Sequence, residues 1–194
     1  MQKNRLEAFS DGVLAIIITI MVLELKVPRG ADWSALAALA PIFSGYVLSF
    51  LYIGIYWNNH HHLIQSTRQV SAAILWTNLH LLFWLSLLPF ATAWVGQNYL
   101  APVPLAIYGV VLLMAALAYF MLQQAIVIQQ GPGSVLAAAL GADWKGKLSP
   151  LAYVAAIPIG FVLPWLAAGL YFGVALLWVV PDRRIERTLR QVGE

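Results

Sequence analysis

The sequence predicts an all-α membrane protein with six transmembrane helices, arranged as a single domain over residues 1–194. Hydrophobic residues make up 61% of the chain and charged residues 10%. In soluble domains about 45–50% of residues are hydrophobic and about 25% are charged. The polar side chains here are therefore too few to cover a soluble globule. Hydrophobic runs long enough to cross a bilayer recur along the chain. The lysines and arginines lie at the ends of these runs, a distribution that indicates membrane topology and not nucleic-acid binding.

The first hydrophobic segment runs from Leu6 to Val27. Its uncharged part lies between two acidic residues, Asp11 and Glu24. At a helical rise of about 1.5 Å per residue, these two residues are roughly 20 Å apart, whereas the hydrocarbon core of a bilayer is about 30 Å thick. At least one carboxylate therefore lies inside the membrane if this helix spans it, which marks the segment as a candidate functional site.

The middle of the chain contains three more segments, separated by polar residues, glycine and proline. After the last of them, residues 129–147 form a loop rich in Gly and Ala, with room for a short interfacial helix. The three segments run from Ser34 or Pro41 to His62, from Val70 to Val95, and from Pro102 to Ile128.

The last hydrophobic run, Leu148 to Val180, is too long for one ordinary spanning helix. It contains Pro158, Gly160 and Pro164. One interpretation is a hairpin of two short helices with Pro164 in the first turn of the second, where a missing N–H costs little. The other interpretation is one long, kinked helix. The length of the run favours the hairpin.

The positions of lysine and arginine predict that both termini are cytoplasmic. With six spans, nine of the eleven basic residues fall on one side of a cell membrane, such as the bacterial inner membrane, and only Lys26 and Arg29 fall on the other. Five spans would place the four C-terminal arginines outside. The nine residues are Lys3, Arg5, Arg68, Lys145, Lys147, Arg183, Arg184, Arg187 and Arg190.

One stripe of the first helix is apolar and carries a single hydroxyl. At 100° per residue, Ile16, Thr19, Ile20 and Leu23 share this stripe, whereas Asp11 points well over 90° away from Ile16. The stripe either faces lipid or a neighbouring helix, or it lines a pore. In a pore, apolar side chains gate by dewetting and a threonine hydroxyl can be a ligand for a cation.

Asp11 requires polar partners if it is buried in the membrane. The third segment offers Trp76, Asn78 and His80, and Arg5 could reach back across the start of the helix. We expect these groups to tie helices together and Asp11 to face protein.

Three consecutive histidines, His60, His61 and His62, end the second segment. On a helix they point in three directions and cannot share one metal ion. We expect interfacial packing with Tyr56 and Trp57. The chain has no cysteine, which excludes disulfides and thiolate metal sites. It also lacks the motifs of enzymes that bind nucleotides, use zinc or carry a nucleophilic serine, so we expect no enzyme activity, no cofactor and no metal site.

The N-terminal motif resembles that of a known family. Arg5-x-x-x-Phe9-Ser10-Asp11, followed by GVLAIIITIMVLELKVP, is similar to the RxxxFSD signature of the TMEM175 family of potassium channels. A single repeat resembles the prokaryotic form, which implies a homotetramer with a central pore lined by the first helix of each subunit. It also implies that the Arg, Ser and Asp of the motif tie this helix to its neighbours.

The same resemblance implies roles for the residues of the stripe. Ile16 corresponds to the pore constriction, Ile20 and Leu23 to further apolar rings, and Thr19 to a residue implicated in potassium preference. Permeant K⁺ would pass near Ile16 and Thr19. No TVGYG-type carbonyl filter is present.

The sequence is compatible with three functions. A potassium-preferring cation channel with a hydrophobic constriction, whose partners are its own copies, the lipid bilayer and monovalent cations, is favoured. A small proton- or cation-coupled secondary transporter could relay protons through Asp11 and His80, but its usual inverted repeats are not apparent. A structural membrane subunit would leave Thr19 and the Asp11 network without a purpose.

Overall fold

The computed structural model describes residues 2–67, 69–131, 134, 136–137 and 144–179. Within these residues all regular structure is α-helical, which confirms the predicted all-α class. The predicted interfacial helix and the C-terminal arginines lie largely or wholly outside the described residues. The helices are α1 (Lys3–Leu23), α2 (Trp33–Ala37), α3 (Ala40–Gln65), α4 (Ala72–Ser86), α5 (Leu88–Gln97), α6 (Pro102–Gln130), α8 (Trp144–Ile159) and α9 (Pro164–Val179).

Four helical segments of the described chain are long and apolar enough to cross a membrane. They are α1, α3, the combined run of α4 and α5, and α6. The α8 and α9 helices have 16 residues each, about 24 Å at the usual rise, which is shorter than a hydrocarbon core of about 30 Å. The protein is therefore a multi-pass membrane protein, and the count of six spans stays a prediction.

The helix boundaries follow local sequence signals. The Ser71 hydroxyl accepts a hydrogen bond from the Ile74 N–H, 3.3 Å away, and so caps α4. The short α2 begins after Asp32, whose carboxylate accepts from the Ala35 N–H at 2.8 Å. This hydrogen bond, together with one from the Ser34 hydroxyl, lowers the pKa of Asp32. Proline occupies the first turn of α3, α5 and α6, where its missing N–H has no helical partner to lose.

The hairpin predicted for the last hydrophobic run is confirmed. The α8 helix ends at Ile159, and α9 begins at Pro164. The Leu163 N–H donates to the Ile159 carbonyl at 2.7 Å, which closes the turn tightly between them. Proline at the start of α9 fits because this position requires no N–H.

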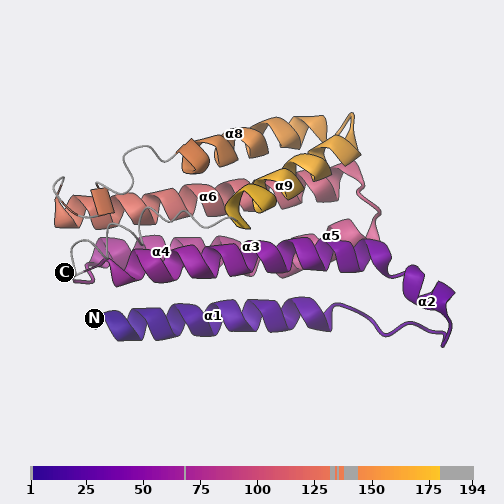
Figure 1. Cartoon of the computed structure of the whole chain (residues 1–194), viewed down its shortest axis with the longest axis horizontal. Helices are drawn as coiled ribbons and strands as arrows, with labels where there is room; N and C mark the ends of the chain where they lie inside the picture. The colour runs from indigo at the N-terminus through magenta and orange to yellow at the C-terminus, as the bar shows by residue number, and fades with distance from the viewer. Residues whose placement is uncertain (1, 68, 132–133, 135, 138–143, 180–194) are drawn as a thin grey trace.

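The helices form three layers (Figure 1). The α1 helix forms one outer layer, α3 with α4 and α5 forms the middle layer, and α6, α8 and α9 form the other outer layer. The start of α1 lies at the same end of the bundle as the end of α3, so these two helices are antiparallel (Figure 1). The α1 helix packs against α3, α4 and α5, whereas α9 packs against α3, α6 and α8.

Buried tyrosines join the middle layer to the far outer layer. The Tyr153 hydroxyl on α8 donates to the Tyr52 hydroxyl on α3 at 3.2 Å. Within the outer layer, Tyr171 on α9 donates to the Leu105 carbonyl on α6 at 3.4 Å. Gly109 makes room for this packing, because a Cβ atom there would overlap the Tyr171 hydroxyl. This outer part of the bundle is thus held by hydroxyl contacts as well as by apolar packing.

Candidate functional site

The α1 helix presents two contrasting faces. Its buried face packs against the middle layer through residues spaced at three or four positions, the spacing of one side of a helix. They are Leu6, Ser10, Leu14, Ile17 and Met21. Its opposite face is exposed over the length of the helix and carries the predicted stripe of Ile16, Thr19, Ile20 and Leu23, with Phe9 exposed near its extension.

The exposed stripe is apolar except for Thr19. Ile16 is 60% exposed and Leu23 is 75% exposed. A contiguous face of large apolar side chains on a single chain indicates contact with lipid, with another chain or with a dewetted channel. The Thr19 hydroxyl donates to the Ala15 carbonyl at 2.9 Å, so its oxygen remains able to accept a contact from outside the helix.

The four motif residues divide between the two sides of α1. Arg5 and Phe9 are exposed, and the Arg5 side chain makes no polar contact with the described residues. Ser10 is fully buried, and Asp11 is partly buried and contacts the next helix. A single chain therefore places only Ser10 and Asp11 in contacts between helices, and not Arg5.

Ser10 belongs to a buried polar cluster that joins three helices. The Asn78 amide on α4 donates to the Ser10 hydroxyl at 3.0 Å, and its carbonyl oxygen lies 2.6 Å from Nε2 of His60 on α3. The Ser10 hydroxyl itself donates to the Leu6 carbonyl at 2.9 Å. Since Asn78 uses both its donor and its acceptor, His60 is assigned as the donor through Nε2–H. Asn78 thus links α1, α3 and α4.

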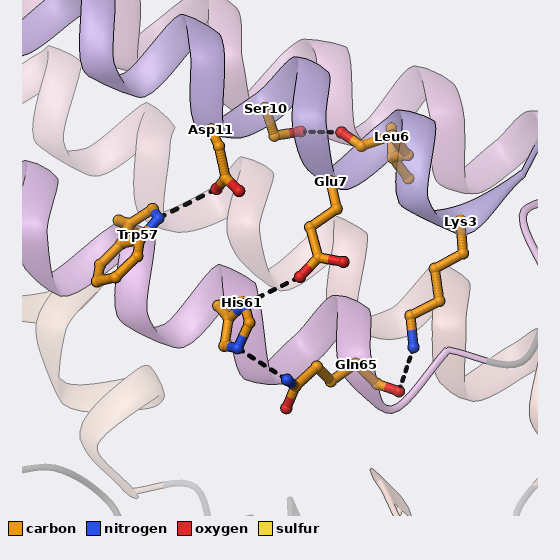
Figure 2. A network of polar contacts seen from close by, with 8 residues as sticks. All are labelled: Lys3, Leu6, Glu7, Ser10, Asp11, Trp57, His61 and Gln65. Atoms are coloured by element: carbon orange, nitrogen blue, oxygen red, sulfur yellow. Dashed lines mark hydrogen bonds and ion pairs between the residues drawn. The ribbon is translucent and has the colours of Figure 1, made fainter.

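A second set of contacts forms a ladder between α1 and α3 (Figure 2). The Trp57 indole N–H donates to the Asp11 carboxylate at 3.0 Å. Nδ1 of His61 lies 2.9 Å from the Glu7 carboxylate, and Lys3 donates to the Gln65 carbonyl at 2.6 Å. The Gln65 amide lies 2.8 Å from the other ring nitrogen of His61. The rungs are one helical turn apart on both helices, because the residues of each helix are spaced by four.

The predicted partners of Asp11 were wrong in part. Asp11 contacts Trp57 of the second hydrophobic segment and not the third segment or Arg5. Asn78 contacts Ser10 instead, His80 accepts from Trp84 within its own helix at 2.9 Å, and Trp76 is 72% exposed. The reason is geometric, since Ser10 and Asp11 point about 100° apart and so meet different neighbours.

Sequence reasoning missed Lys3, Glu7 and Gln65. It expected packing between the histidines and Trp57, which the stacking of His61 on Trp57 confirms, but not the contacts of these two residues with α1. The sequence pattern that could have revealed them is a spacing of four residues that occurs on both helices. The two helices are separated in the chain only by the short α2 and lie antiparallel (Figure 1). The spacing is shared by Lys3, Glu7 and Asp11 on one helix and by Trp57, His61 and Gln65 on the other.

The three consecutive histidines have separate environments, as their directions on a helix predict. His60 is buried against Asn78, whereas His61 stacks on Trp57 and pairs with Glu7. The His61 and His62 rings are 5.7 Å apart at an edge-on angle. Among the described residues, no group of three His, Cys, Asp or Glu side chains could hold a metal ion.

Known proteins are similar to this chain in sequence and in fold. Residues 5–89 match the family model described as the endosomal/lysosomal potassium channel TMEM175. A protein of Chryseobacterium sp. (strain P1-3) named as a potassium channel is 53% identical, over 98% of this chain and 100% of its own length. The human endosomal/lysosomal proton channel TMEM175 is 36% identical over 38% of this chain and 17% of its own length.

A solved structure is similar over nearly the whole chain. It is the crystal structure of a lysosomal potassium-selective channel TMEM175 homolog from Chamaesiphon minutus. The TM-score is 0.81 at 28% sequence identity, with 93% of this chain and 97% of that chain covered.

Proposed function

The chain belongs to the TMEM175 family, a family of channels and not of enzymes, and on that premise we propose that it conducts K⁺ in preference to Na⁺ across the cell membrane. We further propose that four copies assemble around a central pore lined by α1, with six spans per subunit and both termini in the cytoplasm. The observation that carries the proposal is the exposed apolar stripe of α1. It lies on the helix that bears the family motif, in a chain similar to proteins named as potassium channels.

In this arrangement Ile16 forms the narrowest ring, and Ile20 and Leu23 form further apolar rings. These side chains are among the exposed residues of α1, so each can face a common axis without breaking contacts inside its own subunit. An apolar constriction offers no ligands to an ion and controls passage by excluding water. Ions that shed water more easily pass such a constriction with less difficulty.

Thr19 is proposed to favour potassium. It lies one turn beyond Ile16 on the same stripe, and its oxygen retains acceptor capacity because its proton is bonded to Ala15. Four such oxygens could replace part of the hydration shell of a cation. Potassium holds that shell less tightly than sodium, so partial replacement favours potassium.

Ser10 and Asp11 are proposed to orient α1 and not to bind ions. Their contacts with Asn78 and Trp57 fix the rotation of the helix about its own axis. This rotation determines which side chains face the pore. Trp76 and His80 have no contact with α1 among the polar contacts of the described residues, and we propose no role for them in the ion path.

Potassium flux from liposomes that contain the purified protein tests the proposal, together with single-channel recording in planar bilayers. We expect Ile16→Asn to increase the current or to relax selectivity, because an amide wets the constriction. Val22→Asn is the matched control, since Val22 is exposed on α1 but lies about 120° from Ile16 around the helix. Equal effects of the two substitutions, in variants that assemble normally, would contradict the proposed constriction.

Proton permeation is a second candidate function, favoured by the family members in animals that are named as proton channels. Proton flux through the same liposomes, measured with a pH-sensitive dye at zero potassium gradient, distinguishes the two. A current that saturates at turnover rates typical of transporters would instead favour a coupled secondary transporter.

A further inference from the structure

One hollow of the bundle has no residue of α1 in its lining. A groove of about 740 Å³ is bounded by the start of α3, the end of α5, the start of α6 and the start of α9. Phe43, Thr92, Tyr99, Tyr108 and Trp165 are among the residues that line it. Its volume falls within the range of about 300–1,000 Å³ that is usual for small-molecule sites. All four helix ends lie at the end of the bundle opposite to the N-terminus (Figure 1).

The residues that line the groove favour an apolar ligand. None of the described residues that line the groove is charged. The hydroxyls of Thr92 and Tyr108 both bond to Ser49, at 2.6 Å and 3.0 Å, and Ser44 donates to the Pro41 carbonyl at 2.9 Å. Hydroxyls that are already paired gain little from a polar ligand, and a ligand with buried polar groups would leave those groups unpaired. The interior therefore suits an apolar chain.

The rim of the groove has a different character. Tyr99 is 74% exposed and Trp165 is 81% exposed, and both lie at the end of the bundle that the distribution of basic residues predicts to be non-cytoplasmic. Tyrosine and tryptophan concentrate at the level of lipid headgroups because their rings are apolar and their O–H or N–H groups are polar. This places the opening of the groove at a membrane interface, with its body in the hydrocarbon.

We propose that this groove binds one acyl chain of a phospholipid from the non-cytoplasmic leaflet. The inference rests on the proposed tetramer in one respect only. If α1 faces the pore axis, then α9, in the outer layer on the far side of α3 (Figure 1), faces the surrounding lipid and not another subunit. Moving an acyl chain from the bilayer into the groove removes no apolar surface from water, because the surrounding lipid is already apolar. The favourable free energy comes from the van der Waals contacts that the chain makes when it fills the groove.

The groove can be filled by a single substitution. A Cβ atom at Gly45 would lie 3.7 Å from Cγ2 of Thr92, an ordinary contact, so Gly45→Leu fits the backbone and places its side chain in the groove. Gly54 is on the same helix, outside the groove, and has no atom within 4 Å of such a Cβ. Gly54→Leu is therefore the matched control, with the same change in helix propensity.

The test is photolabelling of the full chain in liposomes of phosphatidylethanolamine and phosphatidylglycerol that include a lipid with a diazirine near the end of one acyl chain. Labelled peptides are identified by mass spectrometry. We expect label to concentrate on residues 43–48 and 165–172 in the wild type and in Gly54→Leu. In Gly45→Leu we expect at least a threefold loss of this label relative to label on the remaining lipid-facing helices.

Two results would overturn the proposal. One is label spread evenly over all lipid-facing helices, and the other is label in the groove that Gly45→Leu does not reduce. Potassium flux from the same liposomes separates this inference from the proposed function. Label in the groove without potassium flux refutes the channel and retains the lipid site. Potassium flux with evenly spread label refutes the lipid site and retains the channel.

Discussion

Asn78 is expected to be the most sensitive polar residue of the bundle. It is fully buried and makes one hydrogen bond to α1 and one to α3. The Asn78→Ala substitution removes both and leaves the Ser10 hydroxyl and the His60 ring without this partner. Hydrogen bonds between membrane helices contribute about 0.6 kcal/mol on average and up to about 1.7 kcal/mol, less than in water-soluble cores because the unfolded state in the membrane also finds partners.

Because Asn78→Ala removes two such bonds, we expect it to lower the free energy of unfolding by about 1–3 kcal/mol. For a chain of this length, each kcal/mol lowers the unfolding temperature by about 2–4 °C, so we expect a drop on the order of 5 °C. The measurement is thermal unfolding of the purified protein in detergent, followed by size-exclusion chromatography. Thr77→Ala is the control, because the Thr77 hydroxyl bonds only to carbonyls of its own helix.

A double-mutant cycle identifies the contact itself. Ser10→Ala removes the hydroxyl that Asn78→Ala would leave unpaired, so the loss in the double variant should be smaller than the sum of the two single losses. Additive losses, or a loss in Asn78→Ala no greater than in Thr77→Ala, would refute the assignment of this cluster as the link between the three helices.

Four further outcomes follow from the described contacts. Thr19→Ala should lower the potassium-to-sodium permeability ratio measured from bi-ionic reversal potentials, and an unchanged ratio would remove the hydroxyl from the mechanism. Gly109→Ala should lower the unfolding temperature, because overpacking typically costs about 1–3 kcal/mol and the new methyl group overlaps a tyrosine hydroxyl. Glu7→Gln and His61→Gln should show a coupling in thermal stability that additivity would disprove. A cysteine at Ser34, unique in this chain, should react with a membrane-impermeant maleimide from outside the cell, whereas reaction only after lysis would reverse the topology.

The lengths of the hydrophobic runs and the positions of proline predicted most of the fold. The hairpin was predictable because the last hydrophobic run is too long for one span and because proline suits the first turn of a helix, the place that Pro164 takes in α9. The break between α4 and α5 at Leu87 was not predicted, although Pro89 lies in the first turn of α5 and removes an N–H from the ladder. A hydrophobic run reads as one span whether or not it contains such a break.

The stripe of α1 was predictable for a different reason. Angles around a helix depend only on sequence spacing, so the position of Ile16 relative to Asp11 needs no tertiary information. To predict which neighbour each side chain contacts, the tertiary arrangement of the helices is required. The third segment offers Asp11 candidate partners because it contains amide and imidazole groups, and Arg5 is another candidate, but α3 lies on that side of α1 and Trp57 is the group within reach.

The distribution of polar contacts along α1 has a consequence for the proposed pore. Among the described residues, every hydrogen bond or ion pair from a side chain of α1 to another helix lies at or before Asp11. Beyond that point the helix is held by apolar packing of Leu14, Ile17 and Met21, which is not directional. The first half of α1 is therefore oriented by directional contacts, whereas among the described residues the half that carries Ile16 makes no side-chain hydrogen bond to another helix. In the proposed pore the Ile16 ring lies just beyond the last of these directional contacts, so the motif orients the helix without a side-chain hydrogen bond to another helix at the ring itself.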